Sequence, residues 1–300
     1  MERSITLDIG PELSGREIKY VLKSRLFMSA RLIAKLKRRE DGILLNGERA
    51  FVIKKVAAGD VLTLKISDED EASENIVPVR GEIDIVYEDE DLLLVNKAAG
   101  VPTHPSLDHY RDTLANHTAY YYMEKGRSFT FRPINRLDRN TSGLMLIAKN
   151  SYAQDMAARL HKEGLLKRRY LALVLGDIKT DFGTIDAPIA RADGSVIMRE
   201  VSTKGRPART GYRVLKRFPG AALIEAVPVT GRTHQIRVHM AHIGHPLAGD
   251  FLYGGECEAI PRHALHSYKI EFTHPVSGEA LNFECDMPED MKRAIKYFDR

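Results

Sequence analysis

An acidic run divides the chain into two units of different composition. Ser67-Asp-Glu-Asp-Glu-Ala-Ser-Glu74 has no large apolar side chain to add to a core, and the next one along the chain is Ile76. Just before it, residues 15–55 contain twelve Lys and Arg but only four Asp and Glu. A reversal of charge without hydrophobic content is typical of a flexible linker. We therefore predict three segments: a basic domain at 1–66, an acidic linker at 67–80 and a larger domain at 81–300.

The length and the cysteine count limit the class of protein. Three hundred residues suit one large domain with a smaller one. Cys257 and Cys285 are too few for a disulfide framework and indicate a reducing compartment. The N-terminus lacks the layout of a signal peptide, and no apolar run approaches the roughly 20 residues that cross a bilayer. We expect a cytoplasmic protein without a membrane partner.

The basic domain is predicted to contain two short helices and several strands. Ser14 is expected to cap the first helix and Ser29 the second, each followed by apolar residues at helical spacing. Asn46-Gly47 predicts a hairpin turn, and residues 61–66 predict a further strand. The apolar positions assigned to the two helices are Ile18, Val21, Leu22, Leu32, Ile33 and Leu36.

The second of these helices carries cations on its outer face without matching acids. Arg31, Lys35, Lys37, Arg38 and Arg39 are expected to point outward. The alternative interpretation is an amphipathic helix whose outer face is only solvated. Because the cations gather on one helix, we favour contact with a nucleic-acid backbone. Such contacts position a protein but do not specify its target.

The larger domain is predicted to be rich in strands and to lack an internal repeat. Many strands with intermittent helices, in no regular alternation, favour an α+β fold with a mostly antiparallel sheet. The expected strands are 83–87, 92–95, 143–149, 169–175, 210–215, 223–227 and 267–272, and the expected helices are 112–124, 152–162, 233–243 and 289–297.

One carboxylate stands among cations beside an expected strand. Asp138 lies between Arg136 and Arg139, and a turn cluster at 140–143 and an apolar run at 144–148 follow it. A carboxylate in such surroundings can stay ionised while it faces an anionic ligand. The alternative is an Asp that caps its own turn and pairs with Arg at the surface.

Two further segments combine cations with features of RNA recognition. Three cations at 167–169 precede Tyr170, which strand alternation sends to the face opposite Leu171. Its ring can stack on a base, or it can lie at the edge of the core with its hydroxyl in water. Residues 199–217 carry seven Lys and Arg but a single acid. A solvated face is the usual explanation of a charge run, but this imbalance favours RNA contact.

Residues 228–250 predict a strand, a turn and a helix. Thr233 is expected to cap a helix that ends at Gly244, which places Arg237 in its first or second turn. From there Arg237 can meet a carboxylate from elsewhere in the chain.

The same segment holds four histidines, at positions 234, 239, 242 and 245. Those at 234, 239 and 242 point to different faces of one helix, and no acid stands among the four before Asp250. The His-Glu-x-x-His pattern of zinc proteases is also absent. We therefore expect no metal site.

Together, four blocks resemble the RluA/RluD family of RNA pseudouridine synthases. Arg136-Leu-Asp-Arg-Asn-Thr-Ser-Gly143 matches the family signature Arg-Leu-Asp-x-x-Thr-Ser-Gly. Two positions depart from the commonest pattern, Asn135 in place of His and Asn140 in place of Asp, and we interpret them as signs of different RNA contacts. The other blocks, in the family's order, are Asn96-Lys-x-x-Gly-x-x-x-His104, residues 167–172, and residues 231–239 with 244–250.

The resemblance implies the pseudouridine synthase fold and the isomerisation of uridine to pseudouridine in structured RNA, without metal or cofactor. It makes Asp138 the essential carboxylate, which either attacks the anomeric carbon of the ribose or removes the ribose 2′ proton. Arg237 would pair with Asp138 and keep it ionised. Tyr170 would stack on the flipped uracil, and Arg136 would enter the RNA helix as the base leaves it.

The N-terminal unit resembles the S4-like RNA-binding domain, which accompanies family members that act on large-subunit ribosomal RNA. We expect that substrate and a monomeric enzyme, with transfer RNA as the alternative. A non-catalytic RNA-binding or ribosome-assembly factor, and a metal-dependent hydrolase that uses the histidine-rich helix, are the competing hypotheses. The residues expected to contact RNA are Arg31, Lys35, Arg38, Arg39, Lys97, His104, Lys167, Arg168, Arg206, Arg209, Arg232 and His234.

Overall fold

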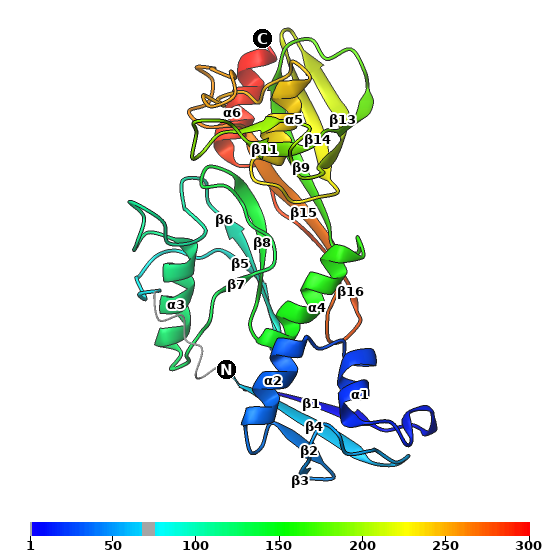
Figure 1. The fold of residues 1–300 in the computed structure, drawn as a ribbon. Helices are drawn as coiled ribbons and strands as arrows, with labels where there is room; N and C mark the ends of the chain where they lie inside the picture. The colour runs from blue at the N-terminus through cyan, green and yellow to red at the C-terminus, as the bar shows by residue number, and fades with distance from the viewer. Residues whose placement is uncertain (1, 68–75) are drawn as a thin grey trace.

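Two β-sheets dominate the structure, a computed structural model that describes residues 2–67 and 76–300 (Figure 1). The predicted acidic linker falls largely on residues 68–75, outside the described residues. One sheet has four strands and lies at the N-terminal end, and the other has ten. Within the described ranges, no helix is both long enough and apolar enough to span a membrane.

The four-stranded sheet contains β1 (Glu2–Asp8), β2 (Ile43–Leu45), β3 (Glu48–Arg49) and β4 (Val61–Ser67), in the order β1-β4-β2-β3. All its pairs are antiparallel. The turn predicted at Asn46-Gly47 is confirmed, because both residues have positive φ, 55° and 83°, as a two-residue hairpin turn requires. β1 has no predicted counterpart, since its only large apolar side chains are Ile5 and Leu7.

Two helices cover this sheet, α1 (Ile18–Ser24) and α2 (Ala30–Arg38), and all six predicted apolar positions are buried. Ser29 caps α2 as predicted, since its side chain accepts a hydrogen bond from the amide of Leu32. The prediction that Ser14 caps α1 is wrong. Ser14 instead closes a single 3-10 turn, η1 (Pro11–Leu13), and α1 begins after Glu17 without a side-chain cap.

The ten-stranded sheet is antiparallel except where β15 runs parallel to β8, which confirms the predicted α+β fold. Its order is β10-β13-β14-β9-β15-β8-β6-β5, with β7 paired to β8 and β16 paired to β15. A separate ribbon joins β11 (Ile189–Arg191) to β12 (Arg199–Val201). The strands are β5 (Ile85–Glu88), β6 (Leu92–Lys97), β7 (Arg132–Pro133), β8 (Ser142–Ala148), β9 (Lys167–Leu175), β10 (Phe182–Asp186), β13 (Arg209–Phe218), β14 (Ala221–Pro228), β15 (Leu265–Thr273) and β16 (Ala280–Glu284).

Helices cover both faces of the large sheet. α3 (Leu114–Glu124) and α5 (Gln235–His242) pack on one face, against a core that includes Val95, Tyr170 and Val174. α4 (Ser151–Lys162) and α6 (Glu289–Phe298) pack on the other face. All four helices lie in predicted segments. Strand alternation explains the two cores, since successive residues of β6, β8 and β9 enter opposite layers.

The N-terminal unit rests on α4 of the large unit (Figure 1). Tyr152 of α4 is part of the N-terminal core. The amide of Ser29, at the start of α2, donates to the Asp155 carboxylate over 2.8 Å. The guanidinium of Arg159 lies 3.4 Å from the centre of the Phe27 ring, a cation–π contact. This arrangement fixes α2 close to the large unit.

Candidate active site

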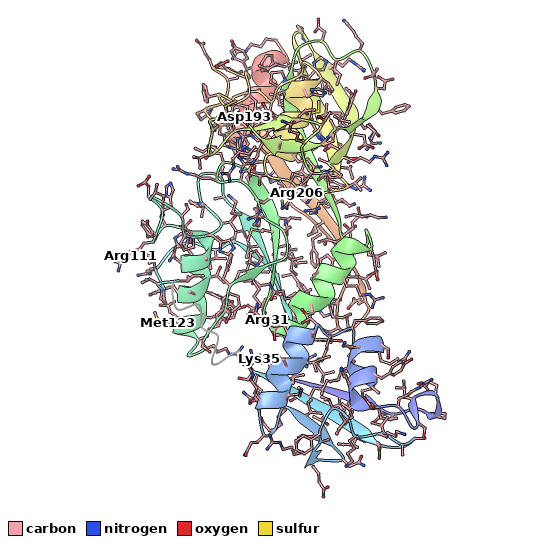
Figure 2. All side chains as sticks on the ribbon, in the orientation of Figure 1. Arg31, Lys35, Arg111, Met123, Asp193 and Arg206 are labelled. Carbon is pink, nitrogen blue, oxygen red and sulfur yellow. The ribbon has the colours of Figure 1, made fainter. Side chains whose placement is uncertain are left out.

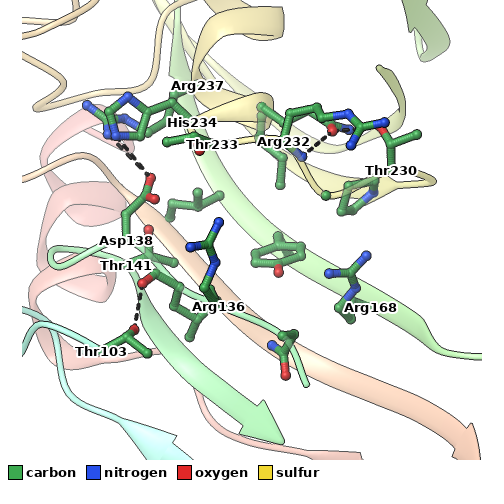
Figure 3. A pocket seen from close by; sticks show the side chains of 18 of the residues that line it. Thr103, Arg136, Asp138, Thr141, Arg168, Thr230, Arg232, Thr233, His234 and Arg237 are labelled. Atoms are coloured by element: carbon green, nitrogen blue, oxygen red, sulfur yellow. Dashed lines mark hydrogen bonds and ion pairs between the residues drawn. The ribbon is translucent and has the colours of Figure 1, made fainter. Parts of the chain in front are cut away.

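A pocket of about 420 Å³ opens at the middle of the large sheet, where β8, β15 and β9 lie side by side (Figure 3). Its volume is within the range of small-molecule sites. Four segments far apart in the sequence line it, together with Leu265 of β15: residues 103–104, the loop at 133–141, the start of β9, and residues 228–237 between β14 and α5. All four predicted blocks therefore contribute residues to the pocket.

Asp138 lies in the loop that leads into β8, and neighbouring elements hold the carbonyls of this loop. The Thr103 hydroxyl donates to the carbonyl of Leu137 over 2.9 Å. Arg262 donates to the carbonyl of Asn140 over 2.9 Å. The loop is thus fixed on both sides of Asp138, whose side chain stays 27% exposed in the pocket.

Lys97 also supports this loop, and the prediction that it contacts RNA is wrong. The residue is only 2% exposed, and its ammonium donates to the carbonyls of Ala98, Val101 and Arg139. Burial lowers the pKa of Lys97 to about 7, although the nearby charge of Asp138 acts in the opposite direction. Lys97 therefore ties the block at 96–104 to the Asp138 loop.

The backbone geometry explains why the signature ends in glycine, at Gly143. It has a φ of 110°, and a Cβ atom there would lie 2.2 Å from the backbone oxygen of Ser267 on β15. Only glycine meets both conditions, so the close pairing of β8 and β15 below the pocket depends on it.

Asn135 and Arg139 have backbone roles in the same loop. Asn135 lines the pocket, and its buried side chain bonds the backbone of Leu144 and Leu146 on β8. Its interpretation as a sign of different RNA contacts stays a prediction. The Nε of Arg139 donates to the carbonyl of Gly100 over 3.1 Å.

Arg237 joins two carboxylates and confirms that a cation from α5 meets Asp138. Its Nη1 lies 3.3 Å from Oδ2 of Asp138, while Nε and Nη2 bind both oxygens of Asp250 over 2.7 and 2.8 Å. Burial alone would lower the pKa of Arg237, but the bonds to Asp250 and the charge of Asp138 raise it above its usual value. A bidentate pair of this kind fixes the guanidinium as well as its charge.

His234 also belongs to the pocket, and it replaces Thr233 as the residue before α5. The cap predicted at Thr233 is wrong, since His234 precedes the helix with a left-handed φ of 57° and no side-chain cap. Its Nε2 lies 3.9 Å from Oδ2 of Asp138, and its Nδ1 lies 2.8 Å from the Tyr253 hydroxyl. Burial lowers the pKa of His234, which favours a neutral ring.

Asp250 and Tyr253 have no predicted role in the sequence, although both touch pocket residues. Tyr253 contacts His234 through its hydroxyl and lies under the guanidinium of Arg237, 5.0 Å from ring centre to Cζ. Asp250 is 1% exposed. The only signal for Asp250 is its place in a recognised block, and Tyr253 has none.

Tyr170 and Arg168 line the pocket from β9. Tyr170 is 6% exposed, lies in the core on the α5 side and faces away from Leu171, as strand alternation predicts. Burial raises its pKa, so the phenol keeps its proton. Arg136 reaches the same pocket from the Asp138 loop but is exposed. Figure 3 shows the side chains of Arg136 and Arg168 pointing into one space.

The other residues predicted to contact RNA fall into separate groups. His104 and Arg232 line the pocket with Arg168 and His234. Figure 2 shows Arg31 and Lys35 on α2, well separated from Arg206 in the large unit. The remaining predicted contacts at Arg38, Lys167, Arg206 and Arg209 are exposed, and Arg39 is half-buried and pairs with Asp41.

The buried histidine of α5, His239, has protein partners rather than a metal. Both ring nitrogens of the buried His239 are hydrogen-bonded, to the hydroxyl of Thr210 and the carbonyl of Ala187. In the parts of the chain that the structure describes, no group of three or more His, Cys, Asp or Glu is arranged to hold a metal ion.

The chain is similar to known proteins over most of its length. Residues 91–242 match the family described as RNA pseudouridylate synthase. The RNA pseudouridine synthase YjbO of Bacillus subtilis is 40% identical over 90% of this chain and 95% of its own length. Ribosomal large subunit pseudouridine synthase D of Nitrosomonas europaea is 34% identical over 98% of this chain and 88% of its own.

A solved structure is similar as well. Human RNA Pseudouridylate Synthase Domain Containing 1 superposes with a TM-score of 0.56 at 30% identity, over 68% of this chain and 83% of that one. Sequence, fold and pocket agree, and the chain belongs to the family of RNA pseudouridine synthases.

Proposed function

We propose that this enzyme converts specific uridines of large-subunit ribosomal RNA to pseudouridine, with Asp138 as the catalytic carboxylate. The observation that supports this most directly is the contact between Asp138 and Arg237 at the wall of the pocket, where Asp250 holds Arg237 bidentately. Asp138 is the partly exposed acid of this group, so it is the one that a substrate can reach.

In the proposed reaction the bond between N1 of uracil and C1′ of the ribose breaks, and a bond between C5 and C1′ forms. C5 loses a proton and N1 gains one, so the reaction is redox-neutral. Asp138 acts either on C1′ itself or on the proton at C2′. Both routes require a carboxylate beside the ribose, and the fixed guanidinium of Arg237 lies 3.3 Å from the carboxylate of Asp138.

Two further pocket residues fit the handling of a base outside the RNA helix. A flipped uracil that enters the pocket meets the ring of Tyr170, and stacking on an aromatic ring contributes about 1–3 kcal/mol per base. Arg136 is exposed and, among the described residues, has no ion-pair partner. It is therefore free to occupy the place that the base leaves, which offsets part of the unstacking cost.

Asp138→Asn tests the catalytic assignment. We expect pseudouridine formation in RNA to fall by about 10⁴-fold or more, as when a nucleophile is removed from other enzymes, while the melting temperature and the affinity for RNA change little. Tritium release from RNA labelled at C5 of uridine measures turnover. Asp299→Asn, an exposed carboxylate at the far end of the chain, is the matched control. Appreciable turnover by Asp138→Asn would exclude the assignment, and unchanged cellular function without turnover would favour a binding factor.

The choice of ribosomal RNA rests on relatives and on charge. Several relatives are named as ribosomal large subunit pseudouridine synthase D. The cations of α2, in the unit that resembles an S4-like domain, are well separated from Arg206, so one RNA that touches both must be large and structured (Figure 2). Mapping of pseudouridines in total RNA from cells with and without the gene tests this choice. Loss of sites in transfer RNA alone would contradict it.

A further inference from the structure

Arg168 is a buried cation without a hydrogen-bond or ion-pair partner among the described residues. The residue is 6% exposed and lines the pocket, and its Nε is a buried donor with no hydrogen-bond acceptor among the described residues. No carboxylate of the described residues forms an ion pair with it. Buried charges in proteins are normally paired, and a buried unpaired donor is costly. The guanidinium points into the pocket (Figure 3), where a ligand can offer an acceptor to its donors.

The neighbouring residue on β9 shows what a structural arginine looks like in this strand. Arg169 faces the opposite side of the sheet, where it donates to Glu225 over 3.1 Å and to Glu271 over 3.0 Å. Two arginines side by side thus differ completely in their partners. The fold therefore provides carboxylate acceptors for Arg169, whereas the acceptors for Arg168 would come from a ligand.

The position of Arg168 indicates which part of the ligand it meets. Arg168 and Tyr170 are two residues apart on one strand and therefore share a face of the sheet. A base that stacks on Tyr170 has its edge beside Arg168. In Figure 3, Arg136 lies between Arg168 and Asp138, so Arg168 occupies the side of the pocket remote from the catalytic carboxylate. A phosphodiester stays near solvent, whereas Arg168 is almost fully buried.

We propose that Arg168 donates a hydrogen bond to O4 of the target uracil and so makes the pocket select uracil over cytosine. This inference rests on the proposed function. With the ribose at Asp138, O4 is the carbonyl oxygen remote from the glycosidic bond and points toward Arg168. Cytosine carries an amino group at this place, which would set a donor against a donor.

The same contact is compatible with the rearrangement. A half-turn of uracil about the axis through N3 and C6 exchanges N1 with C5, and it also exchanges the carbonyl at C4 with the carbonyl at C2. An acceptor oxygen therefore faces Arg168 before and after the turn. Arg168 can hold the base in plane at both ends of the reaction without moving.

The test is a cycle of substitutions in the protein and in the base. The probe is a synthetic RNA that spans a mapped target uridine, in which this nucleotide is uridine, cytidine or 4-deoxyuridine, which lacks O4. Dissociation constants are measured with Asp138→Asn enzyme, so that nothing turns over, with and without Arg168→Met. With Arg168 present we expect the loss of O4 to weaken binding about 10- to 100-fold, the usual range for a hydrogen bond to a charged group. With Arg168→Met the loss of O4 should cost less than about 2-fold.

Two controls keep the outcome decisive. Arg168→Lys retains a cationic donor and should restore most of the dependence on O4, which also covers the case that Arg168→Met folds poorly. Arg293→Met removes an exposed arginine of α6 and should leave the dependence unchanged. If Arg168→Met weakens the binding of all three RNAs equally, Arg168 holds a phosphate and the inference is overturned. Failure of the wild-type enzyme to form pseudouridine would instead overturn the proposed function.

Discussion

The two ends of the pocket treat charge in opposite ways. At the end that holds Asp138, Arg237 is bound by Asp250 and faces Asp138, so its charge is matched before any substrate arrives. At the other end, Arg168 and Arg136 have no carboxylate partner among the described residues. The comparison distinguishes Arg237, whose charge is paired within the fold, from Arg168 and Arg136, which we propose to contact RNA.

The largest expected effect is at the paired end. Arg237→Met leaves the carboxylate of Asp250 buried and unpaired, so we expect the free energy of unfolding to fall by about 3–5 kcal/mol. Chemical denaturation of the large unit measures the change. The double variant Arg237→Met with Asp250→Leu removes both charges and should recover most of the loss, although it remains inactive. If the double variant is as unstable as Arg237→Met alone, the loss of stability does not come from the unpaired carboxylate of Asp250.

At the end of the pocket that holds Arg168, we expect the opposite effect on the free energy of unfolding. Arg168→Met replaces a buried cation that has no ion-pair partner among the described residues by a shorter apolar side chain, so the free energy of unfolding should stay constant or rise by about 1–3 kcal/mol. Arg169→Met, which removes one of the partners of the buried Glu225, should destabilise the protein in the same assay. A loss of stability in Arg168→Met would mean that the fold needs this charge, and the contrast between the two ends would not hold.

The smallest expected effect concerns pH. Burial and the neighbouring cations, first among them Arg237, lower the pKa of His263 to about 2, and its Nε2 lies 2.9 Å from the Thr141 hydroxyl below the Asp138 loop. Because the unfolded chain binds this proton near pH 6.5 and the folded one does not, stability is complete above pH 6.5 and falls as the pH decreases toward 2. Between pH 7 and 5.5 the loss should be about 1 kcal/mol.

His263→Asn should remove this part of the pH dependence. Melting temperatures of the two proteins across this range provide the measurement, and parallel curves would show that His263 does not titrate on unfolding.

Most of the fold could be predicted from hydrophobic periodicity. Segments whose apolar residues repeat at strand or helix spacing, such as β8 and α4, lie in predicted ranges. The strands without predicted counterparts, such as β1, β10 and β12, lack such a signal, because their side chains are mostly exposed or half-buried. Their pairing is decided by the neighbouring strand, which the local sequence does not contain.

Capping was predictable only where the local sequence controls it. Ser29 caps α2 with its own hydroxyl, a contact that spans three residues. Thr233 does not cap α5, because the Gln235 side chain accepts hydrogen bonds from the amide of Arg232 and from the Thr230 hydroxyl. These bonds close a turn in the approach to α5 and move its start to His234.

The sequence by itself determined the family, the identity of the central acid and the arginine that meets it, since these depend on residue types at fixed spacing. Only the tertiary structure decided that Asp250 holds Arg237 and that Lys97 supports the loop from inside. It also decided that Arg168 has no partner among the described residues while Arg169 has two. The physical reason is that burial and pairing are properties of a residue's neighbours in space. Arg168 and Arg169 are adjacent arginines of β9, but their side chains lie on opposite faces of the sheet.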